Sequence, residues 1–427
     1  MKIWLIKLEE KLPIDENYRP SRMGMLAYFL CKRGHDVLRW SSDFQHKIGS
    51  NRFGHDKKIN YSQNLTFKFL SSNITYKSPV SPLRLLNNLH IAYKFSKKAQ
   101  NYQPPDLIVC SMPTTELALV SSQLGKRFNI PVIIDARDMW PDIIEGQLSG
   151  IKKVLSFPII KMMKRNLEIA CKNSTSLVGI TEHFRDFLLN YADREKNENF
   201  DGVFPLSFDS SLNNLSIADK KKAQNFWKQY FPKNFNFKNK KIVYFAGSLN
   251  STVYKALKPI VSLVKKMEKL FPNYIFVFCG KGQYEKEIQS RFINMSNMIM
   301  PGHVNSINLA YLRSISYLAL QPIENRFDYT KSLSNKFFEY ISSGLPIITS
   351  LRGITEFEVK KNKIGYVYKN EIGLFNVMAK LYDDNNLRND MSKNAKKLFI
   401  DKFSHKKVYN NFAIHCENVV KNYHNLK

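Results

Sequence analysis

The chain has 427 residues, 44% of them hydrophobic, which suits a folded protein too long for one ordinary core. Its 65 basic and 36 acidic residues give a formal net charge of +29, which predicts an anionic partner. Five cysteines without a CxxC pair argue against a zinc site or a disulfide framework. No apolar run approaches the roughly 20 residues of a transmembrane helix, and the amino terminus does not resemble a signal peptide.

Three kinds of anionic partner would explain the charge: nucleic acid, a phosphorylated substrate, or an anionic membrane surface. Zinc-finger spacing and RNA-recognition signatures are missing from the sequence, so we expect no nucleic-acid partner. An AT-rich gene would also enrich Lys, Asn and Ile, which is a second explanation for part of the charge.

The first residues predict the opening of a Rossmann-like unit. A strand over residues 2–6 is followed by a polar loop, a helix over 23–31, and a second strand over 37–40. Arg19 and Arg22 belong to the loop in this prediction, so we expect them to face a ligand. The alternative is that both are surface arginines.

Two buried strands follow further along the chain. The first, over 106–110, ends at Ser111, and the second, over 131–134, ends at a charged string, Asp135–Pro141. Open α/β sheets bind ligands at the carboxyl ends of their strands, so Ser111 and the string should lie at one edge. The string is either a solvated loop in which Asp135 pairs with Arg137, or a catalytic loop that faces the acceptor.

Residues 151–172 predict a basic amphipathic helix interrupted or kinked by Pro158. Such a helix suits an anionic bilayer surface. A core-facing helix with a solvated basic side explains the same pattern.

The strand–helix alternation starts again at a strand over 240–246 that runs into Gly247 and Ser248. Glycine lets the backbone approach a phosphate closely. A second strand, over 274–279, runs into Gly280 and Lys281, and a third segment, 300–304, contains His303.

The stretch 332–349 predicts a loop, a short helix, a glycine stop and a buried strand. Ser332 or Ser334 can cap the helix, whose free N–H groups together with Lys336 form an anion site. Glu339 lies one turn further on, where it could hold ribose hydroxyls. The alternative is an ordinary capped helix with a solvated Glu339.

This stretch resembles the donor segment of the family-4 retaining glycosyltransferases, which have two Rossmann-like domains (the GT-B architecture). Residues 334–340 are similar to the Pro-Ser-Lys-hydrophobic-hydrophobic-Glu-Tyr pattern of a subgroup common in bacterial capsule and O-antigen gene sets. The string Asp135–Pro141 is similar to that subgroup's Asp-x-Arg-Asp-x-Trp-Pro signature. Glu339 matches the second glutamate of the family pattern, whereas Lys331 stands at the first.

The resemblance implies an α/β fold of two doubly wound, Rossmann-like domains. Residues 1–210 would bind the acceptor, residues 211–403 would bind the nucleotide sugar, and a final helix over 404–427 would pack back on the first domain. The implied donor-binding residues are Gly247, Ser248, Lys255, Gly280, Lys281, His303, Ser334, Asn335, Lys336 and Glu339. The implied catalytic residues are Arg137, Asp138 and Lys336, and the acceptor contacts are Arg19, Arg22, Ser111 and Trp140.

The implied function is transfer of a sugar, with retention, from a nucleotide sugar (expected to be a UDP-sugar) to a lipid-linked saccharide. The product would be a capsule, O-antigen or related lipopolysaccharide, made by a peripheral enzyme at the inner face of the cytoplasmic membrane. We expect no metal and no cofactor besides the co-substrate. The alternative is a catalytically degenerate protein that binds polysaccharide or carrier lipid, favoured by the missing glutamate at 331 and the missing arginine near 248.

Overall fold

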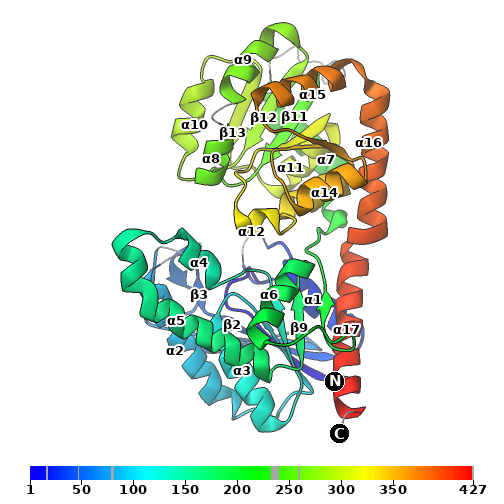
Figure 1. Ribbon diagram of the computed structural model, residues 1–427. Coiled ribbons are helices and arrows are strands. Elements are labelled where there is room, and N and C mark those ends of the chain that lie inside the picture. Colours follow the sequence, from blue (N-terminus) through cyan, green and yellow to red (C-terminus); the bar gives the residue numbers. More distant parts are fainter. Residues whose placement is uncertain (16–17, 47, 78–80, 232–239, 258–259, 426–427) are drawn as a thin grey trace. The chain divides into compact units, whose positions relative to one another are not determined.

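The computed structural model describes residues 1–15, 18–46, 48–77, 81–231, 240–257 and 260–425 (Figure 1). The chain forms two compact units. Unit 1 comprises Met1–Pro205 and Lys406–Lys427, and unit 2 comprises Leu206–His405.

Unit 1 is built on an eight-stranded sheet in the order β10-β9-β8-β7-β1-β2-β6-β5. All neighbouring strands are parallel except β5, which is antiparallel to β6. The central strands are fully buried and read as continuous apolar runs, as expected for a parallel sheet covered on both faces. The strands are β1 Lys2–Ile6, β2 Asp36–Ser42, β5 Lys57–Ser62, β6 Leu65–Leu70, β7 Leu107–Ser111, β8 Val132–Ala136, β9 Ser176–Gly179 and β10 Gly202–Val203.

The helices of unit 1 connect these strands. They are α1 Arg22–Lys32, α2 Pro82–Ala99, α3 Thr115–Phe128, α4 Asp142–Gln147, α5 Gly150–Asn173 and α6 Glu182–Ala192; a small hairpin pairs β3 Phe44–Gln45 with β4 Ser50–Asn51. Pro158 lies inside α5, which remains one helix.

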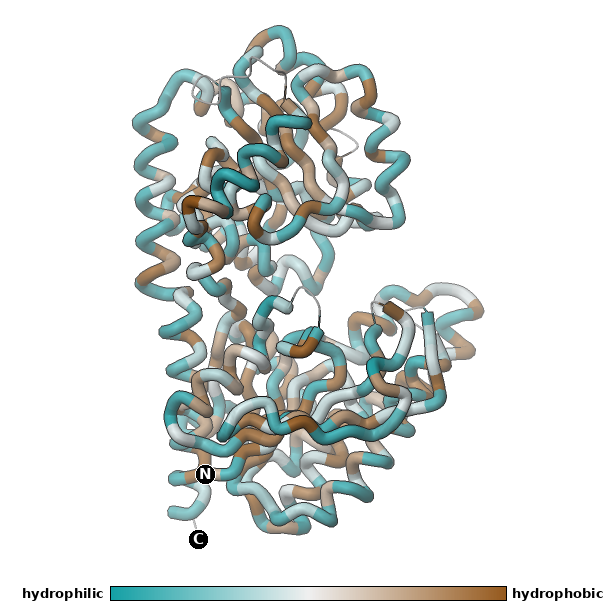
Figure 2. Tube along the Cα trace, turned by 180° about the vertical axis from the view of Figure 1, so that it is seen from behind, coloured by the Kyte–Doolittle hydropathy of each residue, from teal (hydrophilic) through white to brown (hydrophobic). Residues whose placement is uncertain are grey.

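The last helix, α17 (His405–Asn425), returns the chain to unit 1. Its apolar face packs in the same core cluster as β1 and α1, through residues that include Val408, Phe412 and Cys416. Hydrophobic and hydrophilic residues alternate along this helix, as Figure 2 shows.

Unit 2 is built on a six-stranded parallel sheet in the order β13-β12-β11-β14-β15-β16. Alternate residues of β11 enter two separate core clusters: Ile242 and Tyr244 lie in one, Val243 and Phe245 in the other. Helices therefore cover both faces of the sheet, which makes unit 2 doubly wound. The strands are β11 Lys241–Ala246, β12 Tyr274–Cys279, β13 Met298–Gly302, β14 Leu318–Gln321, β15 Ile347–Thr349 and β16 Gly365–Val367.

The fold class predicted from the sequence, two Rossmann-like α/β domains, is confirmed.

The helices of unit 2 are α7 Ile217–Lys228, α8 Ser251–Leu257, α9 Val261–Leu270, α10 Glu285–Phe292, α11 Ser306–Ile315, α12 Phe327–Thr330, α13 Asn335–Ser342, α14 Ile354–Lys361, α15 Glu371–Asp383 and α16 Asn385–Leu398, with a short 3-10 turn at Ser210–Asn213.

Candidate active site

Two glycine turns meet at the carboxyl edge of the unit 2 sheet. The N–H of Gly247, after β11, donates to the carbonyl of Cys279 at 2.9 Å, and the N–H of Gly280, after β12, donates to the carbonyl of Gly302 at 2.7 Å. A Cβ on Gly280 would overlap the carbonyl oxygen of Gly247, and Gly280 has φ +152°. The two turns that the sequence predicted as phosphate loops thus lie side by side, and Gly280 has to be glycine.

The start of α13 is capped as predicted. Ser334 Oγ accepts a hydrogen bond from the N–H of Phe337 at 3.4 Å and another from Gln321 Nε2 at 2.8 Å. Phe337, Phe338, Tyr340 and Ile341 are buried, and Gly344 has φ +68° just after the helix. The cap, the apolar face and the glycine stop are therefore all confirmed.

Lys336 lies against Gly247. A Cβ on Gly247 would stand 2.8 Å from Lys336 Nζ, so the lysine side chain occupies the space that the glycine leaves open. Burial lowers the pKa of Lys336, and the nearby Glu339 carboxylate opposes that shift. A partly buried cation beside the free N–H groups of a capped helix is suited to bind phosphate.

Glu339 is not the solvated side chain of the alternative reading. Only 12% of its side chain is exposed, and its Oε2 lies 3.7 Å from Nη1 of Arg313, a buried residue of α11. Arg313 could not be predicted as part of this site, because it lies 26 positions before Glu339 on a different helix.

Four other predicted donor residues are more exposed than Lys336 and Glu339. Asn335 is the exposed first residue of α13, Ser248 is exposed directly after Gly247, and His303 is exposed directly after β13. Lys281 lies beside Gly302, whose added Cβ would be 3.7 Å from Lys281 Cε. All four lie at the carboxyl edge or the helix start.

In the described part of the chain, Lys255 makes no contact with Gly247, Lys336 or Glu339. It lies in α8, its side chain is 62% exposed, and it pairs with Glu324 at 3.1 Å. Lys331, at the place of the family's first glutamate, has its ammonium 3.8 Å from the centre of the Phe327 ring. Within the described ranges, no group of three or more His, Cys, Asp or Glu side chains is placed to hold a metal ion.

In unit 1 the placement of Arg22 was predicted wrongly. Ser21, not a later residue, is the N-cap of α1, so Arg22 begins the helix instead of ending the loop. Its buried guanidinium donates to both Asp135 oxygens, from Nε at 2.8 Å and from Nη2 at 2.7 Å, and to the carbonyl of Phe204 at 2.7 Å. Arg22 thus fixes the end of β8 and is not available to an acceptor.

Arg137 pairs with Glu10 and not with Asp135, the partner that the solvated-loop alternative gave it. The Arg137 Nη1 to Glu10 Oε1 distance is 3.0 Å, and Glu10 also pairs with the buried Arg39. Burial alone would raise the pKa of Glu10, but these two arginines hold it below its usual range. Arg137 keeps about a quarter of its side chain exposed and is therefore both fixed and reachable.

Lys7, which directly follows β1, is a second buried cation near Arg137. Its ammonium donates to the carbonyl of Met112, and burial together with the Arg137 charge lowers its pKa to about 8. One sequence signal marks Lys7 and Glu10 as candidate site residues: both lie just beyond the carboxyl end of the first strand.

The remaining acceptor-side residues lie at the same edge of the unit 1 sheet. Ser111 pairs in register with Asp135 and is almost fully buried. Trp140 is partly exposed, with the Arg84 guanidinium 4.4 Å from its ring centre. Asp138 is partly exposed and Arg19 is exposed.

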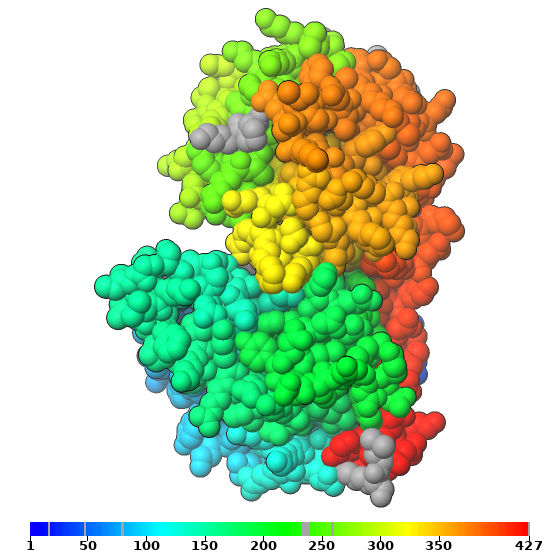
Figure 3. All heavy atoms as spheres, viewed as in Figure 1, coloured from blue at the N-terminus to red at the C-terminus, as the bar shows by residue number. Residues whose placement is uncertain are grey.

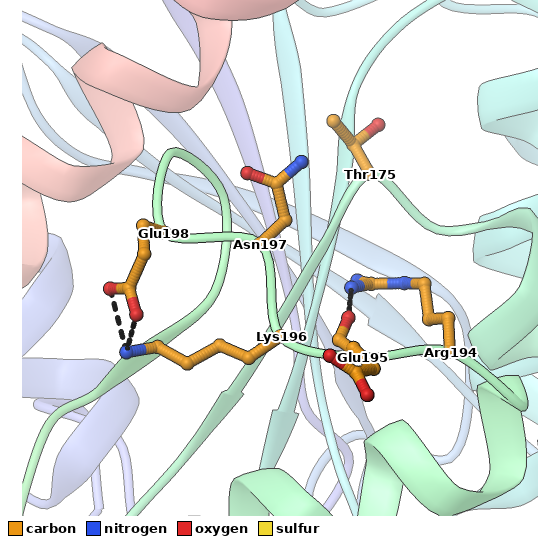
Figure 4. Close-up of a pocket in the computed structure, with 6 residues that line it drawn as sticks. All are labelled: Thr175, Arg194, Glu195, Lys196, Asn197 and Glu198. Carbon is orange, nitrogen blue, oxygen red and sulfur yellow. Dashed lines mark hydrogen bonds and ion pairs between the residues drawn. The ribbon is translucent and has the colours of Figure 1, made fainter.

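A separate open cavity of about 480 Å³ lies elsewhere on unit 1 (Figure 4). It is lined by Thr175, which precedes β9, and by the loop 194–198 after α6. It thus lies toward the amino end of β9, away from the carboxyl edge that carries Asp135 and Arg137. Lys196 and Glu198 pair across its rim at 2.6 Å.

Residues 227–398 match the family described as Glycosyl transferases group 1. This segment runs from α7 to α16 and includes Gly247, Lys336 and Glu339. No curated protein matches the sequence.

Solved structures share the fold over nearly the whole chain. Sucrose-phosphate synthase from Thermosynechococcus elongatus is 13% identical with a TM-score of 0.67 and covers 99% of both chains. WaaG, a glycosyltransferase involved in lipopolysaccharide biosynthesis, is 14% identical with a TM-score of 0.61, covering 96% of this chain and 98% of its own. Anabaena HepE in complex with UDP is 12% identical with a TM-score of 0.60, covering 98% and 100%. Residues 227–398 of unit 2 are therefore similar to the group 1 glycosyl transferases, and the chain has the GT-B fold of these solved structures.

Proposed function

We propose that the chain transfers a sugar from a nucleotide-sugar donor held by unit 2 to a saccharide acceptor held by unit 1. The observation that carries this proposal is the partly buried Lys336 against Gly247 at the capped start of α13, with Glu339 one turn further on. An ammonium and free N–H groups suit a diphosphate, and a fixed carboxylate suits a ribose diol.

A UDP-sugar is the donor that we propose. Anabaena HepE, which shares the fold, has been solved with UDP and with UDP-glucose. The glycine turn at Gly280 and the segment around His303 would complete the nucleotide site beside Lys336.

The reaction depends mainly on stabilisation of the leaving group by the protein. The bond between the sugar and the phosphate breaks, a bond from the sugar to the acceptor oxygen forms, and the departing phosphate oxygen takes the acceptor proton. Lys336 and the N–H groups of Ser334–Asn335 would neutralise the charge that develops on the diphosphate. Arg137 and Asp138 would contact the reacting sugar or acceptor from unit 1.

We propose a lipid-linked saccharide as the acceptor, in the synthesis of a bacterial surface polysaccharide. Two observations support it: the Asp135–Pro141 string, and the membrane-suited start of α5. Ile151, Val154, Leu155 and Phe157 are exposed there beside Lys152 and Lys153, and Figure 3 shows this region on the surface of unit 1. From Ile160 onward the same helix packs into the core. Among the described residues, no helix is long and apolar enough to cross a bilayer.

A second candidate is a degenerate protein that binds saccharide or carrier lipid without catalysis. The observation that favours it is Lys331, which places a cation over the Phe327 ring where the family pattern has a carboxylate.

The experiment is a panel of UDP-, GDP- and dTDP-sugars tested by thermal shift, with release of free nucleotide followed in parallel. The proposed enzyme would be stabilised by one nucleotide class and would slowly release that nucleotide. Stabilisation without any release, even with lipid-linked acceptors added, would favour the degenerate protein, and no shift with any donor would contradict the donor site itself.

A further inference from the structure

Arg313 is a buried cation in the middle of unit 2 that touches the side chain assigned to the ribose. We propose that Arg313 is a positioning residue that holds the Glu339 carboxylate in place for the ribose hydroxyls of the nucleotide. This inference rests on the proposed function and deepens it, because it says what makes the donor site selective for a ribonucleotide.

The guanidinium of Arg313 is fixed from several sides. Nη2 donates to Asn213 Oδ1 at 3.0 Å, and Nη1 lies 3.5 Å from the hydroxyl of Tyr244. Its carbon lies 5.4 Å from the centre of the Phe208 ring. These partners come from residues 208–213 before α7 and from β11, and Asn213 also donates to Ser342 Oγ of α13 at 3.1 Å, which ties the Arg313 site to the helix that carries Glu339.

Nη1 of Arg313 then faces Glu339 Oε2 at 3.7 Å. Their side chains are 5% and 12% exposed, so the pair is shielded from solvent and salt. A carboxylate buried to this degree needs an opposite charge, and breaking such a pair leaves it uncompensated.

The surroundings of the pair are aromatic, which strengthens its effect. The rings of Tyr244 and Tyr340 pack edge to face at 5.6 Å between centroids, and burial raises the pKa of both phenols. The phenols are neutral, so the charges that compensate Glu339 come from Arg313, at ion-pair distance, and from the nearby Lys336. An ion pair to one oxygen also restricts rotation of the carboxylate, which pre-organises it for a diol.

The test measures ribose recognition separately from the rest of nucleotide binding. UDP and GDP are titrated calorimetrically beside their 2′,3′-dideoxy forms, which keep the base and the diphosphate. In the wild type the ribonucleotide should bind tighter than its dideoxy form. Arg313→Gln should weaken ribonucleotide binding about tenfold and leave the dideoxy form within about twofold, so the preference collapses. Arg313→Lys should restore part of it.

The matched control is Arg388→Gln. Arg388 is a partly buried arginine of unit 2, which donates to the carbonyl of Tyr317 at 2.8 Å, before β14 and so at the amino edge of the sheet. This variant should lose stability without changing the preference for ribose.

Two outcomes would overturn the inference, and each is distinct from failure of the proposed site. If Arg313→Gln weakens both forms equally, Arg313 serves the fold and not the carboxylate. If Arg313→Gln leaves the preference unchanged while Glu339→Gln abolishes it, Glu339 needs no positioning by Arg313. If Glu339→Gln does not change the preference for ribose, the proposed contact between Glu339 and the ribose is itself contradicted.

Discussion

Gly247 and Gly280 face each other in the structure. Substitution of Gly247 should affect nucleotide binding, whereas substitution of Gly280 should affect stability. A Cβ on Gly247 would meet the end of the flexible Lys336 side chain, 2.8 Å from Nζ. We expect Gly247→Ala to change the free energy of unfolding by no more than about 0.5 kcal/mol and to weaken UDP or GDP binding at least about tenfold.

Gly280→Ala would place its Cβ on the backbone carbonyl of Gly247 and would force φ +152° on a side-chain-bearing residue. We expect it to lower the free energy of unfolding by about 2 kcal/mol or more. Denaturant unfolding and calorimetric titration of both variants check this pair. Full nucleotide affinity in Gly247→Ala would show that Lys336 does not bind the diphosphate.

At the scale of single residues, the sequence predicted what depends on local patterns. Ser334 as the cap and Gly344 as the helix stop follow from helix chemistry alone, and both are present. The ion pairs were missed because their partners are distant: Glu10 and Arg137 are 127 positions apart, and Arg22 and Asp135 are 113 apart. Local periodicity holds no information on such pairs, which form only when strand ends converge.

At the scale of elements, the two halves of α5 differ in exposure to solvent, and only the first half is free to bind a membrane. Leu155 and Phe157 are exposed apolar residues beside basic ones, whereas Ile160 and Met163 are buried. The double variant Leu155→Glu and Phe157→Glu should lose most of its binding to phosphatidylglycerol vesicles, because it removes apolar contact and adds like charge to the anionic surface.

Vesicle co-sedimentation measures this binding. The matched control is Ile217→Glu, since Ile217 is an exposed apolar residue at the start of α7 in unit 2. Equal binding by the double variant and the wild type would remove α5 from the proposed membrane contact. Release of nucleotide from a soluble donor should be unchanged in both variants.

The α17 helix contributes a pH-dependent contact to unit 1. His415 Nε2 lies 3.2 Å from Ser176 Oγ, and its ring packs on Phe204 with 5.0 Å between centroids. Burial lowers the pKa of His415 to about 4, against a smaller opposing effect of Asp201.

Because the unfolded chain takes up this proton near pH 6.5 and the folded chain only near pH 4, stability should fall as the pH drops through that window. The full effect is about 3 kcal/mol. In His415→Asn the free energy of unfolding should vary less between about pH 7 and pH 4.5 than in the wild type. His424→Asn, a change at an exposed histidine of the same helix, should keep the wild-type dependence. Identical pH profiles for all three proteins would contradict the burial of a neutral His415.

Most elements were predictable because their apolar periodicity is strong. The short helix α8, at Ser251–Leu257, was not predicted. The loop after β14 also contains a short helix, α12, that polar residues concealed.

At the scale of the whole molecule, the sequence predicted two doubly wound units because the alternation of strands and helices restarts near residue 240. The return of α17 to unit 1 depends on tertiary packing of its apolar face, and its assignment in advance came from family resemblance and not from periodicity. The family match covers residues 227–398, so it applies to unit 2. The acceptor of unit 1 has to be identified by experiment.

The most direct test of the central claim is calorimetric titration of the nucleotide selected by the donor panel into the wild type and Glu339→Ala. We predict that the variant binds at least about tenfold more weakly. Because the variant leaves buried Arg313 without its ion-pair partner, its thermal unfolding temperature should fall, and both proteins are therefore titrated at a temperature at which both are folded. Equal affinity in the two proteins would contradict the claim that the start of α13 binds a nucleotide sugar.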